Sequence, residues 1–197
     1  MPEIIYRSVS VDELQLNSNE VAYRLGTDRG YTDKLIEGCL EELKRVLTPK
    51  YCFTVSEAKY GENNLIDLGY MKINSEKLTK NLRGSKRVYT FAATIGHGAD
   101  RLLAKQSKIS SAKYFVTDGL SSAYAEALAD YANKYIAEGK SCYPRFSPGF
   151  GDVPLSVQPE VLGAVNAAKL LGITLSDTFL TTPMKSVTAL IGEKNED

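Results

Sequence analysis

The order of the helix and strand patterns is the feature that most constrains the fold of this chain. Extended patterns gather in the middle, at 51–60, 65–73 and 87–96, and a long segment rich in Ala and Ser follows at 110–138. The turn-forming GENN between the first two extended segments predicts a hairpin, and RVYTFAATIG predicts a buried strand. Because strands and helices do not alternate regularly, the order favours an α+β fold, with a mixed or antiparallel central sheet and flanking helices, over repeated βαβ units.

Four stretches carry helix patterns. Thr32 is a suitable N-cap for the first, in which apolar residues recur on one face, and Gly172 is a suitable stop for the last. Gly119 lies inside the third, where it would bend or thin the helix. Two strands, at 178–182 and 186–191, are expected to close the chain. The predicted helices cover 32–47, 97–106, 110–138 and 157–171.

The size and charge of the chain exclude several classes of function. Its 197 residues are enough for one domain with a sizeable core, and we expect a single domain over 1–197. Basic and acidic residues number 24 each and form no basic run, which disfavours a surface for nucleic acid or anionic membrane. Charges near the N-terminus do not fit a signal peptide, and no apolar run approaches the ~18 residues of a membrane span. We therefore expect a cytoplasmic protein.

The cysteines and the histidine argue against a metal site. Cys39, Cys52 and Cys142 are odd in number and widely spaced, which predicts reduced thiols and excludes a CxxC pair; Cys39 is expected in the core. His97 is the one histidine of the sequence, which excludes a multi-histidine site, and no GxSxG elbow supports a catalytic triad. We expect neither a metal nor a catalytic side chain.

The loop RFSPGFGDVPLS, residues 145–156, is suited to holding a small anionic ligand. Pro148 fixes its own φ, while Gly149 and Gly151 allow backbone conformations and close approaches that a Cβ would block. Arg145 adds a planar fork that matches a carboxylate or a phosphate. A surface turn rich in Gly and Pro is the alternative interpretation, and it is the commoner identity of such a stretch.

The residues after this loop, VLGAVNAAKLLGITLSDTFLTTPMKSVTALIG, extend the pattern into a resemblance. With RFSPGFG they resemble the activation domain of cobalamin-dependent methionine synthase, whose signature is an Arg, three residues, then Gly and an aromatic. Here these positions are Arg145, Gly149 and Phe150, where Phe150 replaces the usual Tyr. In the helix DGLSSAYAEALADYANKYI, Glu126 falls at the family's acidic position, and PMKSVTALIG is similar to its late strand. The resemblance is strongest over 87–192.

The resemblance implies that the chain binds S-adenosylmethionine. Arg145 would pair with the ligand carboxylate, and Glu126 would attract the ammonium group or a ribose hydroxyl. Backbone groups of the glycine loop would meet the adenine or ribose, with apolar contact from the ring of Phe150. An acidic position that the family uses early in the domain has no clear counterpart in the N-terminal half. The implied ligand-binding residues are Glu126, Arg145, Pro148, Gly149, Phe150 and Gly151.

The resemblance also implies a role and partners. In the family this domain presents S-adenosylmethionine to an inactive cobalamin, so that reductive methylation restores the active cofactor. The chain lacks the Asp-x-His-x-x-Gly pattern that ligates cobalt, so cobalamin is expected only through a partner protein. The implied partners are a corrinoid-bearing methionine synthase without its own activation module and a flavodoxin- or ferredoxin-like reductant. The chain would then be an accessory component of a methyltransferase.

Two alternatives of other classes remain open. One is a binding or sensing module that keeps the ligand and methylates nothing. The other is an oxidoreductase that binds a nicotinamide dinucleotide, because RVYTFAATI running into GHGADR begins like a dinucleotide fingerprint. Arg101 stands where the third glycine would be, although Asp118 lies at a suitable distance for a ribose contact. The structural interpretation is a strand-to-helix turn in which Gly96 and Gly98 relieve the bend.

Overall fold

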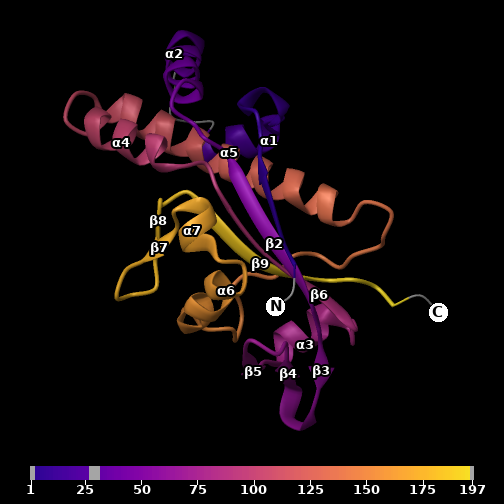
Figure 1. Ribbon diagram of the computed structural model, residues 1–197. Helices are drawn as coiled ribbons and strands as arrows, with labels where there is room; N and C mark the ends of the chain where they lie inside the picture. Colours follow the sequence, from indigo (N-terminus) through magenta and orange to yellow (C-terminus); the bar gives the residue numbers. More distant parts are fainter. Residues whose placement is uncertain (1–2, 27–31, 196–197) are drawn as a thin grey trace.

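A computed structural model describes residues 3–26 and 32–195 of the chain. Its centre is a four-stranded sheet in which every neighbouring pair is antiparallel, flanked by helices on both faces (Figure 1). The α+β prediction with a central sheet and flanking helices is therefore confirmed. In spatial order the strands are β1 (Ile4–Ser8), β2 (Lys50–Glu57), β6 (Arg87–Thr94) and β9 (Ser186–Gly192).

The strands alternate their side chains between two apolar layers. Phe53 lies opposite Phe91, which lies opposite Ala189, so these side chains form one row across three strands. All three belong to the core on the first face of the sheet. Cys52 and Ala92, the neighbours in sequence, belong to a separate core on the second face. Both faces are buried, which explains why RVYTFAATIG is almost continuously apolar.

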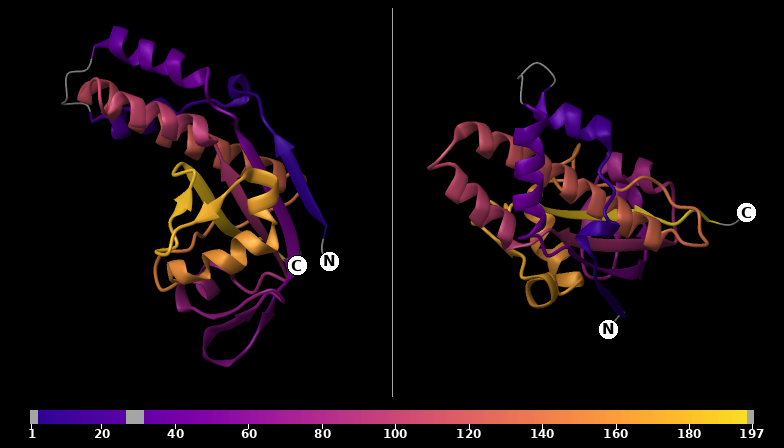
Figure 2. Two further views of the ribbon diagram at one scale, coloured as in Figure 1. Left: turned by 60° about the vertical axis from the view of Figure 1, so that its left-hand side comes forward. Right: turned by 90° about the horizontal axis from the view of Figure 1, so that it is seen from above.

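Four helices cover the first face. The longest packs directly on the sheet, and the others lie outside it, gathered at one end of an elongated molecule (Figures 1 and 2). Thr32 caps the second of them as predicted, since its Oγ1 accepts a hydrogen bond from the Leu35 amide at 3.3 Å. In chain order they are α1 (Ser18–Leu25), α2 (Asp33–Lys44), α4 (His97–Gln106) and α5 (Ser111–Ile136). None of the helices in the described residues is long and apolar enough to span a bilayer.

Shorter elements cover the second face and extend the opposite end of the molecule (Figure 1). The helices there are α3 (Glu76–Leu82), α6 (Gln158–Ala164) and α7 (Ala167–Leu171). The strands are β3 (Lys59–Tyr60), β4 (Leu65–Asp67), β5 (Lys72–Asn74), β7 (Thr174–Leu175) and β8 (Thr181–Thr182). The described residues also form the 3₁₀ turns η1 (Val11–Glu13), η3 (Glu62–Asn64) and η4 (Leu155–Val157).

Several predicted elements differ in detail from the structure. The strand predicted over 178–182 is reduced to β8, and the one predicted over 65–73 is divided into the antiparallel β4 and β5. The helix predicted over 157–171 is divided into α6 and α7, because Asn166 adopts a left-handed conformation with φ of 51°. Gly172, with φ of 72°, ends α7 as predicted. The GENN turn does join antiparallel strands, but only β3 and β4 pair across it, while β2 pairs with β1 and β6 in the main sheet.

Gly119 serves packing in α5. A Cβ at this position would lie 3.0 Å from Leu25 Cδ2 and 3.3 Å from the carbonyl oxygen of Arg24. Both of these atoms belong to the C-terminal end of α1. The missing side chain therefore lets α1 lie close against α5, which fixes the position of every side chain that α1 carries.

We expect Gly119→Ala to gain none of the stability that the same change gives elsewhere in a helix. Gly38, in the middle of α2, is a matched control, because nothing lies within 4 Å of its missing Cβ. Gly38→Ala should raise the free energy of unfolding by roughly 0.5–1 kcal/mol through helix propensity. In Gly119→Ala the contact with α1 should cancel or reverse this gain. Urea denaturation of both variants measures the difference, and equal stabilisation of the two would contradict it.

Candidate functional site

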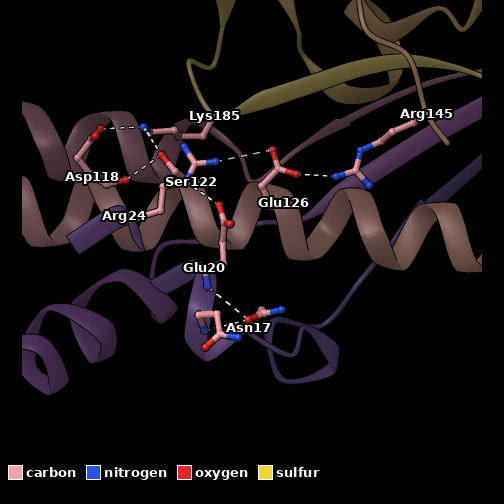
Figure 3. A network of polar contacts seen from close by, with 9 residues as sticks. Asn17, Glu20, Arg24, Asp118, Ser122, Glu126, Arg145 and Lys185 are labelled. Carbon is pink, nitrogen blue, oxygen red and sulfur yellow. Dashed lines mark hydrogen bonds and ion pairs between the residues drawn. The ribbon is translucent and has the colours of Figure 1, made fainter. Parts of the chain in front are cut away.

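Polar side chains form a row along one side of α5 (Figure 3). They are spaced by four residues, which places them on one side of a helix. Cations from three other elements approach this row (Figure 3). The row consists of Asp118, Ser122, Glu126 and Asp130, and the cations are Arg24 of α1, Arg145 after α5 and Lys185 before β9.

Arg145 joins two carboxylates of the row. Its Nη2 donates to Glu126 Oε2 at 2.6 Å and its Nη1 donates to Asp130 Oδ1 at 2.5 Å. Burial disfavours the charged guanidinium, but the hydrogen bonds and charges of Asp130 and Glu126 outweigh burial and raise the pKa of Arg145 above its ordinary value. The two charged residues that the sequence singled out are therefore in contact with each other.

Backbone pairing of the segment after α5 with β9 holds Arg145 in this position. The neighbouring residue, Phe146, exchanges two hydrogen bonds with Leu190 of β9, at 2.9 and 2.8 Å. The edge of the sheet thus directs the chain that leaves α5 back along that helix. Lys185, just before β9, reaches the same helix face and donates to Ser122 Oγ at 2.9 Å and pairs with Asp118 at 2.7 Å. The segment PMKSVTALIG accordingly lies beside the row.

The helix α1 supplies the opposite wall. Asn17 begins it, accepting hydrogen bonds at its Oδ1 from the amides of Asn19 and Glu20 at 2.9 and 3.3 Å. Arg24 lies one helical turn after Glu20, and its Nε donates to Glu20 Oε1 at 2.6 Å. The Nη2 of Arg24 lies 4.0 Å from Glu126 Oε1 (Figure 3). Glu126 therefore lies between two guanidinium groups, one from each wall.

A polar cavity of about 340 Å³ opens between α1 and α5, and a second of about 590 Å³ adjoins it. Both volumes fall within the ~300–1,000 Å³ typical of small-molecule sites. The first cavity is lined by three carboxylates, of Glu20, Glu126 and Asp130, and by the guanidinium of Arg24. With Arg145, which pairs with two of these carboxylates from outside the lining, the net charge of the group is −1. Such a site suits a small zwitterion or cation. The first cavity is lined by Gln15, Asn17, Glu20, Arg24, Ala123, Glu126, Ala127 and Asp130.

The glycine loop lies apart from this cavity, because none of its predicted contact residues is among the lining residues. Gly149 and Gly151 adopt the left-handed conformations that only glycine takes readily, with φ of 88° and 62°. Pro148 is buried, and the ring of Phe150 is 68% exposed. The amide of Gly149 donates to the Val153 carbonyl at 2.8 Å, so this donor is used within the loop. A ligand contact at the loop therefore stays a prediction.

Asp152 anchors the glycine loop to α3. Its carboxylate accepts hydrogen bonds from the Ser75 hydroxyl and from the Glu76 amide, the latter at 2.8 Å, at the first turn of that helix. The Ser75 hydroxyl and the backbone amides stabilise the charged form and lower the pKa of Asp152. The glycine loop is therefore held by α3, on the second face of the sheet, whereas Arg145 is held by α5, on the first face.

Several lining residues were missed from the sequence. Asp130 could have been found, because it lies one helical turn after Glu126 and has the same charge. The sequence around Glu20 and Arg24 does not indicate a binding site, because no local pattern shows that α1 packs on α5. Glu20 also supplies an acidic group from the N-terminal half, where none could be placed from the sequence.

The turn that resembles a dinucleotide fingerprint has a structural explanation. A Cβ on Gly98 would lie 1.9 Å from the Val46 carbonyl oxygen, and one on Gly96 would lie 2.1 Å from Thr48 Oγ1. Both glycines therefore let the connection between α2 and β2 lie against the start of α4. The strand β6 pairs with antiparallel neighbours, whereas a dinucleotide fold has parallel strands there. Within residues 3–26 and 32–195, no group of three or more His, Cys, Asp or Glu residues could hold a metal.

The chain is similar in fold to a solved structure of the MetH reactivation domain bound to AdoHcy. The match has a TM-score of 0.69 and covers 100% of this chain and 80% of that one, with 13% sequence identity. Likeness at this identity shows the fold alone. No family model matches the sequence, and no curated protein matches it.

We expect Asp152 to stabilise the protein near neutral pH and to lose this effect in acid. A lowered pKa means that the folded state favours the carboxylate, so its contribution is complete above the ordinary aspartate pKa of about 4 and disappears as pH falls through the lowered pKa. Asp152→Asn should therefore be less stable than the wild type at pH 7, with a difference that shrinks towards pH 2. Thermal melts from pH 7 to 2 measure this, with the exposed Asp177→Asn as control. A difference independent of pH would contradict it.

Proposed function

We propose that this chain binds S-adenosylmethionine between α1 and α5 and acts as a stand-alone activation component, supporting reductive methylation of cobalamin on a partner methionine synthase. The contact between Glu126 and Arg145 carries this proposal. The motif resemblance assigns these two residues to opposite charges of one ligand, and the structure joins them at 2.6 Å beside a cavity of suitable size. The fold likeness to the MetH reactivation domain supports the same family.

The charges around the cavity match the amino-acid end of the ligand. A ligand carboxylate would bind the planar fork of Arg145 in place of one of its present carboxylate partners. The displaced Glu126 or Asp130 would then receive the ligand ammonium group. The sulfonium adds a further positive charge, which the negative balance of the cavity favours.

The glycine loop is proposed to meet the other end of the ligand. Backbone groups of Gly149 and Gly151 are exposed there, and Pro148 beside them is buried and fixes the turn. The exposed ring of Phe150 offers an apolar face to the adenine or ribose. An elongated ligand would thus run from the polar row on α5 towards the loop that follows Arg145.

Positioning is the contribution of this chain to the reaction. When bound, S-adenosylmethionine supplies an electrophilic methyl group on a sulfonium, and its leaving group is a neutral thioether. Arg145, Glu126 and Asp130 would fix the amino-acid end and thereby the direction of that methyl group. The chain needs no general acid or base for such a transfer, which agrees with the prediction that no catalytic side chain is present.

The proposed partners are a corrinoid-bearing protein and an electron donor. The sequence of this chain has no cobalt-ligating Asp-x-His-x-x-Gly pattern, so the corrinoid belongs to a methionine synthase that lacks its own activation module. The electron comes from a flavodoxin- or ferredoxin-like reductant. A cytoplasmic location suits this role, and the free thiols of Cys39, Cys52 and Cys142 suit a reducing compartment.

We expect the purified protein to bind S-adenosylmethionine with a micromolar dissociation constant and not to bind a nicotinamide dinucleotide. Arg145→Ala should weaken the binding about 10- to 100-fold, because it removes a charged hydrogen bond. Arg45→Ala is the matched control, since Arg45 is a highly exposed arginine at the C-cap of α2 and pairs with Glu41. Isothermal titration calorimetry measures all three proteins. An unchanged constant in Arg145→Ala would contradict the assignment of Arg145.

We further expect the protein to restore a methionine synthase that holds inactive, oxidised cobalamin and lacks an activation module. With S-adenosylmethionine and a reduced flavodoxin, the absorbance of methylcobalamin should return, and Arg145→Ala should slow this return. Binding of S-adenosylmethionine without any effect on the cobalamin would favour the sensing module instead.

A further inference from the structure

Glu126 holds its two cations unequally. Its Oε2 accepts a hydrogen bond of 2.6 Å from Arg145, whereas its Oε1 lies 4.0 Å from Arg24 Nη2, beyond hydrogen-bond distance. Arg24 makes its close contact with Glu20, at 2.6 Å on the same helix. The attraction between Arg24 and Glu126 is therefore electrostatic and easily broken.

We infer that Arg24 is a displaceable internal cation, which occupies the place beside Glu126 that the ammonium group of the ligand takes. This inference rests on the proposed function and adds a residue that controls affinity and ligand choice at the same site. Arg24 lines the same cavity as Glu126, Asp130 and Glu20, so one cation is shared among carboxylates that a ligand also needs.

Arg24 has a second ion-pair partner on its own helix. Glu20 lies one helical turn before it, so the guanidinium can leave Glu126 and keep a full ion pair. The backbone of Arg24 cannot move away as easily, because its carbonyl lies against Gly119 of α5. Only the side chain, which is about one-third exposed, is free to move. Displacement of the Arg24 guanidinium therefore breaks the 4.0 Å contact with Glu126 and keeps the 2.6 Å ion pair with Glu20.

This arrangement should weaken the binding of ligands that carry an ammonium group. Such a ligand places a second cation beside Glu126 while Arg24 remains within the cavity, and like charges at this separation repel. A ligand without an amino-acid end does not compete for Glu126. Arg24 therefore acts against S-adenosylmethionine and S-adenosylhomocysteine, and does not act against methylthioadenosine, which keeps the nucleoside and the thioether.

Replacing Arg24 tests the inference. Arg24→Gln keeps a polar, though shorter, side chain and removes the charge. We expect it to tighten the binding of S-adenosylmethionine and S-adenosylhomocysteine by roughly three- to tenfold, given partial screening by water, and to leave methylthioadenosine unchanged. Arg24→Lys keeps the charge and should bind all three ligands like the wild type. Titration calorimetry at low salt measures the three constants, and melting curves check that each variant is folded.

The outcomes separate this inference from the proposed function. Binding of S-adenosylmethionine by the wild type, with weaker or unchanged binding by Arg24→Gln, would overturn the inference and keep the function. Equal tightening of methylthioadenosine would also overturn it, because the effect would then be on cavity space. Binding only after the substitution would support it. Failure of wild type and variants alike to bind any of the ligands would overturn the function. Arg24→Met, which keeps the apolar stem, replaces Arg24→Gln if that variant does not fold.

Discussion

The packing of α5 is the constraint on which the rest of the structure depends. One side of this helix is apolar and lies on the sheet, where Leu120 and Leu128 are almost completely buried. Another side carries the charged row that includes Glu126 and Asp130. Because the helix is fixed by its buried side, the spacing of its charges is fixed too, and other elements bring their cations to it.

Two of the three cations, Arg24 and Arg145, reach α5 through separate backbone contacts. Gly119 lets α1 lie close enough for Arg24 to approach the row. The pairing of Phe146 with Leu190 turns the chain so that Arg145 returns along the helix. Neither the close approach at Gly119 nor the Phe146–Leu190 pairing involves a charged side chain, and both depend on the backbone. The site therefore depends on close packing at positions that a survey of charged residues would not select.

The sequence predicted the elements whose signals are local. The α+β class, the helix capped by Thr32, the strand over 87–96 and the long helix over 110–138 all follow from apolar spacing and turn residues, and the structure agrees with them closely. The division between α6 and α7 was missed, because it depends on a left-handed Asn166 inside an otherwise helical pattern. β1 and α1 were missed as well, since short elements near a terminus gain most of their stability from partners distant in sequence.

The same distinction applies to the candidate site. Glu126 and Arg145 were found because a motif resemblance named them, and their contact joins residues 19 positions apart. Glu20 and Arg24 come from a helix more than 100 positions away from Glu126, and no local pattern links them.

The charges of this site are paired with one another, and this pairing bears on which ligands it can accept. Arg145 and Glu126 are partly buried, so removing one of them leaves the other with an unpaired and partly desolvated charge, whereas the exposed Asp130 keeps its hydration by water. A ligand with only a carboxylate would take Arg145 and leave Glu126 and Asp130 without it, and a ligand with only an ammonium would leave Arg145 short of a partner. A zwitterion would replace both partners at once, because its carboxylate would pair with Arg145 and its ammonium group with Glu126 or Asp130. For a ligand that binds at Arg145, the self-paired network would favour an amino-acid end over a lone carboxylate or a lone ammonium group.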